Sequence, residues 1–199
     1  MVRKNILQTG NGQRHRHTYL WYLTFSIENY KKMKHIETNL SKIEHLAHVR
    51  EDENFRFRAF LKEKDGEKVD RIVHRLHEEI TGKIDCLSCG NCCKLQVELD
   101  EEDIEVLSRL ENISPESYED SYCETDAFGD VVLKVKPCRY LEGTTCTIHE
   151  HKPRRCKEFP NTHKKDFNHR LLGMISYYEI CPIVFNLMEQ LKDEMRFRR

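Results

Sequence analysis

Four cysteines stand within eight consecutive residues of this chain, in a segment (residues 86–93) that reads CLSCGNCC. Cysteine thiolates bind zinc and iron, and a Cys-x-x-Cys step lets the backbone turn so that two sulfurs face one ion. The step occurs twice in succession here, through Cys86, Cys89 and Cys92. Three thiolates from one segment supply most of a tetrahedral site, so the pattern predicts metal binding with a further ligand from elsewhere in the chain.

The adjacent cysteines, Cys92 and Cys93, place a second constraint on the site. Neighbouring side chains project in different directions from the backbone, so both thiols would be strained on one mononuclear ion. We therefore expect them to serve two nearby centres, or two metals of one cluster. A vicinal disulfide between them is the competing interpretation.

The chain has nine cysteines, and the five outside this segment are spread over its C-terminal half. Cys138, Cys146, Cys156 and Cys181 are available to complete the site. Cations beside a thiol favour the thiolate that binds metal. Such cations flank three of the candidate ligands, although a chain this rich in charge would place some there by chance: Lys94, Arg139, Arg155 and Lys157.

The metal itself stays open between zinc and iron. Zinc prefers four-cysteine tetrahedra and often takes Cys-x-x-Cys pairs. Iron–sulfur clusters also use Cys-x₂-Cys-x₂-Cys together with a further cysteine before proline, and Cys181-Pro182 is such a pair. Ligand chemistry alone does not separate zinc from iron or from an iron–sulfur cluster.

Four ordered motifs carry a family resemblance: CLSCGNCC at 86–93, PCRYLEGTTCTIHE at 137–150, KPRRCKEFP at 152–160 and ICP at 180–182. Together they make the chain resemble the YkgJ-type cysteine-cluster family (CxxCxxCC), described as a zinc- or iron-chelating domain, over most of residues 84–185. Lys152 stands where that family often has arginine. Cys123 lies outside the family pattern and is expected to be a free or core thiol. The resemblance implies eight metal ligands: Cys86, Cys89, Cys92, Cys93, Cys138, Cys146, Cys156 and Cys181.

The resemblance leaves the biochemical activity undefined, and whether the protein is an enzyme stays open. A related cysteine cluster occurs in flagellin lysine methylases. This implies an alternative function, an iron–sulfur-dependent redox or group-transfer enzyme such as one with protein-lysine N-methylase-like activity. A third reading makes the ion a cargo. No catalytic residue is assigned, and the sequence holds no Gly-rich phosphate loop or nucleotide fingerprint.

Other residues that could take part in metal or nucleic-acid binding are expected to have structural roles instead. His74 and His77 are expected to have a helix-surface role, and any one of His149, His151 and His163 has a smaller claim to replace a cysteine ligand. The basic and aromatic stretch 54–62, NFRFRAFLK, is expected to form an amphipathic helix that docks its phenylalanines on the cluster domain rather than on nucleic acid.

The elements that must position these cysteines are mainly helical, with a small β element and irregular cysteine-bearing loops organised around metal. Helical spacing of apolar residues predicts helices within 36–49, around 55–60 and within 69–80. Asp100, Pro115 and Pro182 are expected at the starts of three more. A strand is expected within 131–136 with 146–149 as its partner, and an irregular stretch between 153 and 160.

Composition bounds the remaining questions. The 199 residues carry a formal net charge of −1, so no global field points to nucleic acid or to a basic partner, and no apolar stretch is long enough for a membrane helix. A protein partner and the oligomeric state stay open, and a cytoplasmic location is expected. Three regions are predicted: a weakly ordered leader (1–32), a helical extension (33–83) and a cysteine-cluster domain with a C-terminal helix (84–199). Met33 is a plausible alternative start.

Overall fold

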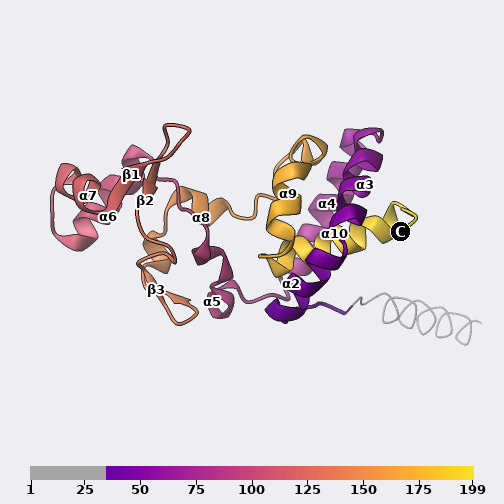
Figure 1. The fold of residues 1–199 in the computed structure, drawn as a ribbon, viewed down its shortest axis with the longest axis horizontal. Helices are drawn as coiled ribbons and strands as arrows, with labels where there is room; N and C mark the ends of the chain where they lie inside the picture. The colour runs from indigo at the N-terminus through magenta and orange to yellow at the C-terminus, as the bar shows by residue number, and fades with distance from the viewer. Residues whose placement is uncertain (1–34) are drawn as a thin grey trace, which may run out of the picture. The chain divides into compact units, whose positions relative to one another are not determined.

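The computed structural model describes residues 35–199, which are mainly helical with two small β-sheets (Figure 1). The predicted fold class, mainly α with a small β element, is confirmed; the predicted leader lies outside the described residues. The boundary predicted between residues 83 and 84 stays a prediction.

The elements used below are α2 (Leu40–Val49), α3 (Glu51–Lys62), α4 (Gly66–Thr81), α5 (Cys86–Cys89), α6 (Glu101–Glu111), α7 (Pro115–Tyr122), α8 (Arg154–Glu158), α9 (Leu171–Tyr178), α10 (Pro182–Glu194), β1 (Cys123–Thr125), β2 (Val131–Leu133), β3 (Leu141–Glu142) and β4 (Thr145–Cys146).

Capping residues set several helix starts where the sequence predicts them. The Asp65 carboxylate accepts a hydrogen bond from the Lys68 amide at 2.7 Å and so begins α4 after the predicted Asp-Gly break. Asp100 and Asp103 form a capping box on α6, each accepting from the other's backbone amide. A side-chain N-cap of this kind contributes about 1 kcal/mol.

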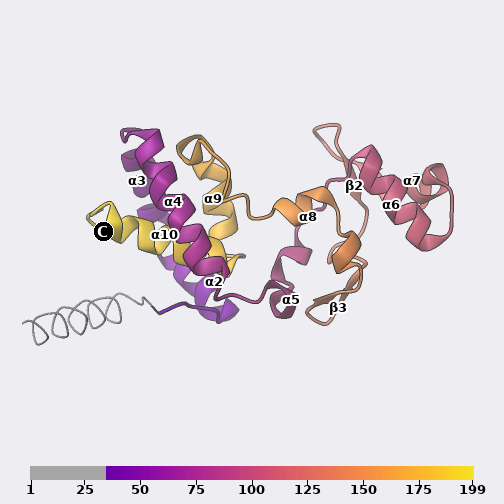
Figure 2. The same ribbon diagram turned by 180° about the vertical axis from the view of Figure 1, so that it is seen from behind.

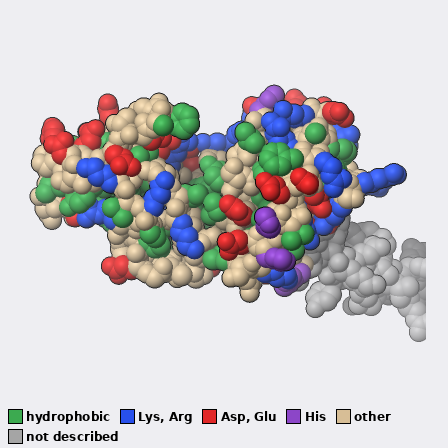
Figure 3. Space-filling view, in the orientation of Figure 1, with side chains coloured by type: hydrophobic (Ala, Val, Ile, Leu, Met, Phe, Trp, Pro, Cys, Tyr) green, Lys and Arg blue, Asp and Glu red, His purple; other side chains and the backbone are tan. Residues whose placement is uncertain are grey.

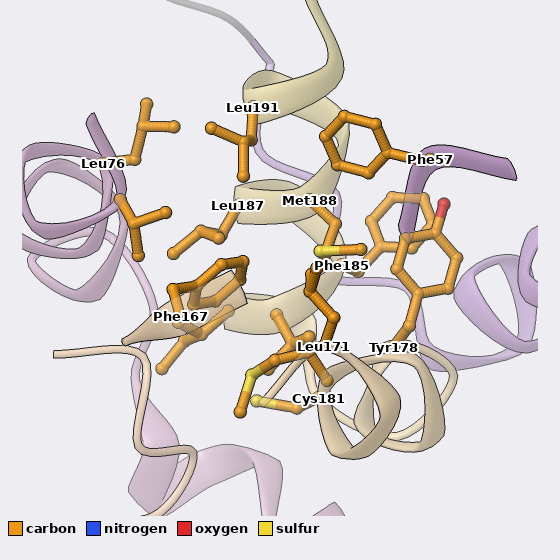
Figure 4. Close-up of a cluster of buried hydrophobic side chains, with 14 of the residues drawn as sticks. Phe57, Leu76, Phe167, Leu171, Tyr178, Cys181, Phe185, Leu187, Met188 and Leu191 are labelled. Carbon is orange, nitrogen blue, oxygen red and sulfur yellow. The ribbon is translucent and has the colours of Figure 1, made fainter. Parts of the chain in front are cut away.

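The larger of two hydrophobic clusters, here called the helical core, is built by α2, α3, α4, α9 and α10, which lie together (Figures 1 and 2). Apolar residues at helical spacing put one face of α4 into it, and α10 is buried over most of its length. Figure 4 draws part of this core, with Cys181 at its edge. Side chains at the centre include Phe57, Leu76, Phe167, Leu171, Tyr178, Leu187, Met188 and Leu191.

The predicted amphipathic helix in residues 54–62 is confirmed as part of α3, and its phenylalanines pack against C-terminal residues within 84–199, the region predicted as the cluster domain. Phe57 is fully buried, and its ring lies 5.0 Å from that of Phe197 near the C-terminus. Phe60 packs against the same ring at 5.3 Å, whereas Phe55 is 45% exposed. The phenylalanines of α3 therefore hold the C-terminal residues and α9 to the helical core.

A second cluster, here called the small core, is formed by α6, α7 and the β1–β2 hairpin. Cys123 is only 5% exposed and belongs to it, which confirms the expected core position of this thiol. β2 pairs with β1, so the predicted pairing with residues 146–149 is wrong. The turn through Gly129, at φ +91°, closes a local hairpin, and β4 pairs instead with the preceding strand, β3.

The stretch around Cys156, predicted to be irregular, forms the short helix α8. Pro153 precedes its first turn, a position where a missing amide proton costs nothing. The carboxylate of Asp103 accepts a hydrogen bond from the Arg154 amide at 2.9 Å, which fixes the start of α8 to α6. The capping partner is 51 residues away, so local sequence did not reveal this helix.

Within residues 35–199 no single helix has both the length and the apolar composition to cross a membrane. The pair α9 and α10 meets those criteria only when taken together, and the two helices are bent by 117° at their junction.

The helical core contains one fully buried cation, Lys192. Its ammonium lies 2.7 Å from a carboxylate oxygen of Glu53 and 2.7 Å from one of Glu189. Burial alone would raise the pKa of Glu189, but Lys192, the Tyr178 hydroxyl and Arg50 together outweigh it and leave that pKa lowered. The carboxylate of Glu189 therefore depends on these partners to offset its loss of hydration.

We predict that Lys192→Met destabilises the protein by about 3 kcal/mol, because it leaves two partly buried carboxylates without their ammonium. The free energy of unfolding from urea titration, followed by circular dichroism, measures the loss. Lys68→Met on the exposed surface of α4 is the matched control and is expected to change stability by less than about 0.5 kcal/mol. Equal stabilities of the two variants would contradict the role of the buried pair.

Candidate metal centre

All eight cysteines that the sequence predicts as ligands line one cavity, of about 310 Å³. They come from five separate stretches of the chain, up to 95 residues apart between Cys86 and Cys181. Cys123, the ninth cysteine, does not line it. The ligation itself stays a prediction, but the gathering of these side chains is a property of the fold: Cys86, Cys89, Cys92, Cys93, Cys138, Cys146, Cys156 and Cys181.

Gly90 turns the segment that carries four of these cysteines. Asp85 caps α5 by accepting from the Leu87 amide at 2.9 Å, and Gly90 ends this helix in the left-handed conformation, at φ +58°. A 3-10 turn, Asn91–Lys94, follows. The predicted tight turn at Gly90 is confirmed, and it separates Cys86 and Cys89 on α5 from the adjacent pair on the 3-10 turn.

Two hydrogen bonds tie this segment to distant cysteines. The side-chain amide of Asn91, which is 8% exposed, donates to the carbonyl of Ile180 at 2.7 Å, next to Cys181. The amide of Cys138 donates to the carbonyl of Cys93 at 2.8 Å. The adjacent pair is therefore held between Cys181 on one side and Cys138 on the other.

Electrostatic coupling groups the eight thiols into two sets that interact through Cys92. The pKa of Cys181 is raised mainly by burial, and the neighbouring thiols that add to it are Cys86 and Cys89. Burial also raises the pKa of Cys92, and it is raised further by Cys93, Cys181, Cys156 and Cys89, in that order, so Cys92 is coupled to members of both sets. We call these four residues the first thiol group: Cys86, Cys89, Cys92 and Cys181.

Cys93, the other member of the adjacent pair, is coupled to a different set of thiols. Burial raises the pKa of Cys93, and the thiols of Cys138 and Cys146 raise it further. Cys156 is coupled to the same three residues. These form the second thiol group, and Cys92 and Cys93 interact where the two groups adjoin: Cys93, Cys138, Cys146 and Cys156.

Burial keeps several of the thiols, Cys92, Cys156 and Cys181 among them, protonated at neutral pH when no cation is present. It raises the pKa of Cys181 to about 12, and burial together with neighbouring thiols raises that of Cys156 to about 12. The pKa of Cys92 is raised for the same reasons. A bound cation would reverse this balance, because it replaces protons and neutralises the thiolates that like-charge repulsion disfavours.

The donor set fits a thiophilic metal in kind and in number. Within residues 35–199, however, no three Cys, His, Asp or Glu side chains stand close enough together to hold an ion as they are. Protonated thiols carry no charge that would draw them to a common point, so a cavity lined by thiols is compatible with the lack of a preformed ligand cluster. Metal binding would require thiol side chains to rotate toward a shared ion inside the cavity that they line.

The cations that flank cysteines in the sequence are mostly engaged elsewhere. Arg139 does lower the pKa of Cys138, although burial has the larger, opposite effect. Its guanidinium also lies 3.5 Å from the centroid of the Tyr122 ring and 3.3 Å from a carboxylate oxygen of Glu111. Arg155 lines the cavity but is ion-paired with Glu98.

Lys152 is the cation that acts on several thiols, and sequence reasoning missed it because it flanks none of them. It lines the cavity, and it opposes the effect of burial on the pKa values of Cys86, Cys93 and Cys156. The signal available in the sequence was the KPRRC motif, where Lys152 lies four residues before Cys156.

The histidines divide into two kinds. His77 packs against the loop after α8: its Nδ1 lies 2.7 Å from the Thr162 hydroxyl, and its ring centroid is 5.5 Å from that of His163. Burial, and then the neighbouring His163, lower its pKa. His74 contacts the same loop at the Lys164 carbonyl. His149 instead lines the thiol cavity, while His151 and His163 do not.

We predict that Gly90→Ala disrupts the cavity, whereas Gly143→Ala is tolerated. Alanine at either position destabilises the left-handed backbone by about 1–2 kcal/mol, since φ is +58° at Gly90 and +62° at Gly143. A Cβ at Gly90 would also lie 2.4 Å from the carbonyl oxygen of Thr144, whereas one at Gly143 meets nothing within 4 Å. Free energies of unfolding should therefore show the larger loss for Gly90→Ala, and the same loss in both variants would refute this packing.

Comparison with known proteins supports the identity of this site. Residues 85–172 match the family model "CxxCxxCC: Putative zinc- or iron-chelating domain". No curated protein and no solved structure matches the chain. The matched segment ends before Cys181, which the fold nevertheless brings to the same cavity. The resemblance to the CxxCxxCC family that the ordered cysteine motifs indicated is confirmed by this match over residues 85–172.

Proposed function

We propose that the protein binds two metal ions, zinc or iron, one in each thiol group. The observation that supports this is the convergence of eight cysteines from distant parts of the chain on one cavity. Four thiolates satisfy a tetrahedral ion completely. The first ion would be held by Cys86, Cys89, Cys92 and Cys181, and the second by Cys93, Cys138, Cys146 and Cys156.

The adjacent cysteines favour two centres over one. Cys181 and Cys89 act on Cys92 but not on Cys93, and Cys138 and Cys146 act on Cys93 but not on Cys92, although Cys92 is also coupled to Cys93 and Cys156. The backbone contacts follow the same division, with Asn91 bonded beside Cys181 and Cys93 bonded to Cys138. With two neighbouring ions, the side chains of Cys92 and Cys93 can each point toward a different ion without strain.

The ions have a structural role in this proposal, because members of the two thiol groups pack in different hydrophobic cores. Cys181 is part of the helical core, while Cys138 and Cys156 pack against the small core. An ion closed by four thiolates has no open position for a substrate and supplies cross-links. Ligands that are far apart in sequence make its binding energy a contribution to folding.

An iron–sulfur centre with redox or group-transfer activity is the second candidate. The Cys-x₂-Cys-x₂-Cys run with a remote Cys-Pro favours it, as does the apolar lining of the cavity by residues such as Leu95, Ile148 and Tyr177. A location in the reducing cytoplasm suits both candidates, because all eight site cysteines are free thiols.

Metal analysis of the adjacent-pair variants tests the proposal. The full chain, purified anaerobically, should contain two equivalents of metal by elemental analysis. Cys92→Ser and Cys93→Ser should each lose one equivalent and retain the other, because each removes one of four ligands from a single centre. Cys123→Ser, which changes a core thiol outside the cavity, should retain both.

Three outcomes would contradict it. A folded wild-type chain without metal would overturn metal binding altogether. Loss of both equivalents from each single variant would indicate one shared cluster instead of two centres. Visible absorption that bleaches on reduction, with inorganic sulfide present, would favour the iron–sulfur candidate over mononuclear ions.

Metal affinity should rise with pH. Burial and neighbouring thiols raise the pKa values of Cys92, Cys156 and Cys181, so these groups are protonated at pH 7 in the metal-free protein and must release protons when an ion binds. Zinc competition with a chromogenic chelator at pH 6.5 and pH 8 should therefore show tighter binding at the higher pH, after correction for protonation of the chelator. Affinity independent of pH would exclude protonated thiols as the ligands.

A further inference from the structure

The thiol cavity contains one ammonium group that no carboxylate neutralises. Two strongly basic side chains of residues 35–199 line the cavity, Lys152 and Arg155, and Arg155 is ion-paired with Glu98. Lys152 has no acidic partner within that part of the chain. Its Nζ instead lies 3.2 Å from the Nε2 of His149, which lines the same cavity.

The backbone on both sides of Lys152 is held in place by hydrogen bonds. His149–His151 form a 3-10 turn, closed by the His151 amide donating to the Ile148 carbonyl at 2.8 Å. Pro153 follows, is buried, and leads directly into α8, whose first amide is held by Asp103. Lys152 is thus bracketed by a closed turn and an anchored helix, and the half-buried side chain cannot leave the cavity without losing its contact with His149.

Lys152 interacts electrostatically with cysteines of both thiol groups. It acts electrostatically on Cys86, which belongs to the first group, and on Cys93 and Cys156, which belong to the second. A divalent ion with four thiolates carries a net charge of −2, so two such centres bring −4 into a partly buried site. An unpaired cation at the junction lowers the electrostatic cost of holding them together.

We propose that Lys152 is the shared counter-ion of the two metal–thiolate centres, positioned by the imidazole of His149. Lys152 is a positioning and charge-compensating residue and not a ligand; the proposal rests on the two-metal function proposed above. In this arrangement the ammonium donates to Nε2 and His149 accepts. His149 then orients Lys152 and does not replace a cysteine as a ligand.

The test is zinc affinity of the full-length protein, measured by competition with a chromogenic chelator. Lys152→Gln should lower zinc affinity about tenfold, the lower end of the range for groups that act through a ligand. Lys152→Arg, which keeps the charge, should recover most of that loss. Lys157→Gln is the matched control, since this lysine flanks Cys156 in the sequence but is exposed and does not line the cavity.

Two further readouts separate a charge effect from damage to the fold. The affinity difference between wild type and Lys152→Gln should shrink as ionic strength rises, because salt screens charge interactions. His149→Ala should weaken binding in the wild type but add little to Lys152→Gln, because both changes remove the same interaction. Saturating zinc should still load two equivalents in every variant.

The results distinguish this inference from the proposed function. If the wild type binds two ions and Lys152→Gln binds them with wild-type affinity, the counter-ion role is wrong while the metal function stands. An affinity loss that Lys152→Arg fails to recover, or additive losses in the double variant, would also overturn it. A wild type that binds no zinc would remove the basis of both.

Discussion

The central constraint on this structure is that eight thiols line one cavity, to which two separate hydrophobic cores contribute cysteines. The helical core supplies Cys181 from its interior, and the small core holds Cys138 and Cys156 against its surface. Between them the cysteine segment is bonded in both directions, through Asn91 to the Ile180 carbonyl and through the Cys93 carbonyl to Cys138. The site therefore joins parts of the chain that share little apolar contact of their own, and a bound ion there would act as part of the architecture.

Charge explains why a cavity of this kind calls for cations. Without an ion, burial keeps several of the thiols protonated and uncharged, so the empty site has little electrostatic strain. With ions, the thiolates carry more negative charge than the metals neutralise. Elsewhere on the face drawn in Figure 3 basic and acidic side chains are interspersed, in keeping with the near-neutral net charge of −1. An unpaired ammonium beside the thiols, from Lys152, is then the notable local exception.

Much of the fold could be predicted because local signals and tertiary packing agree. The apolar spacing of α4, the caps at Asp65 and Asp100, and the prolines that open α7 and α10 all lie where the sequence indicates. The failures share a cause in long-range contacts. The helix α8 is anchored by Asp103, far away in sequence, and the partner of β2 was misassigned because two short hairpins close locally.

The same division applies to the site. The ordered cysteine motifs were enough to predict which eight thiols line one cavity. That Cys92 and Cys93 serve different centres stays a prediction. The motifs did not predict which cation acts on several thiols. Proximity in sequence pointed to Lys94, Arg139, Arg155 and Lys157; of these only Arg155 lines the cavity, where it is ion-paired with Glu98, and Lys152 lines the cavity as well. Proximity along a chain says little about charge across a cavity, because side chains that flank a buried thiol point away from it as often as toward it.

The most direct test of the account is X-ray absorption spectroscopy at the metal edge of the anaerobically purified, metal-loaded protein. The account predicts a first shell of four sulfur atoms per metal at about 2.3 Å if the metal is zinc, with no nitrogen or oxygen ligand. A first shell that contains nitrogen or oxygen, or fewer than four sulfurs per ion, would contradict the division of eight cysteines into two closed centres.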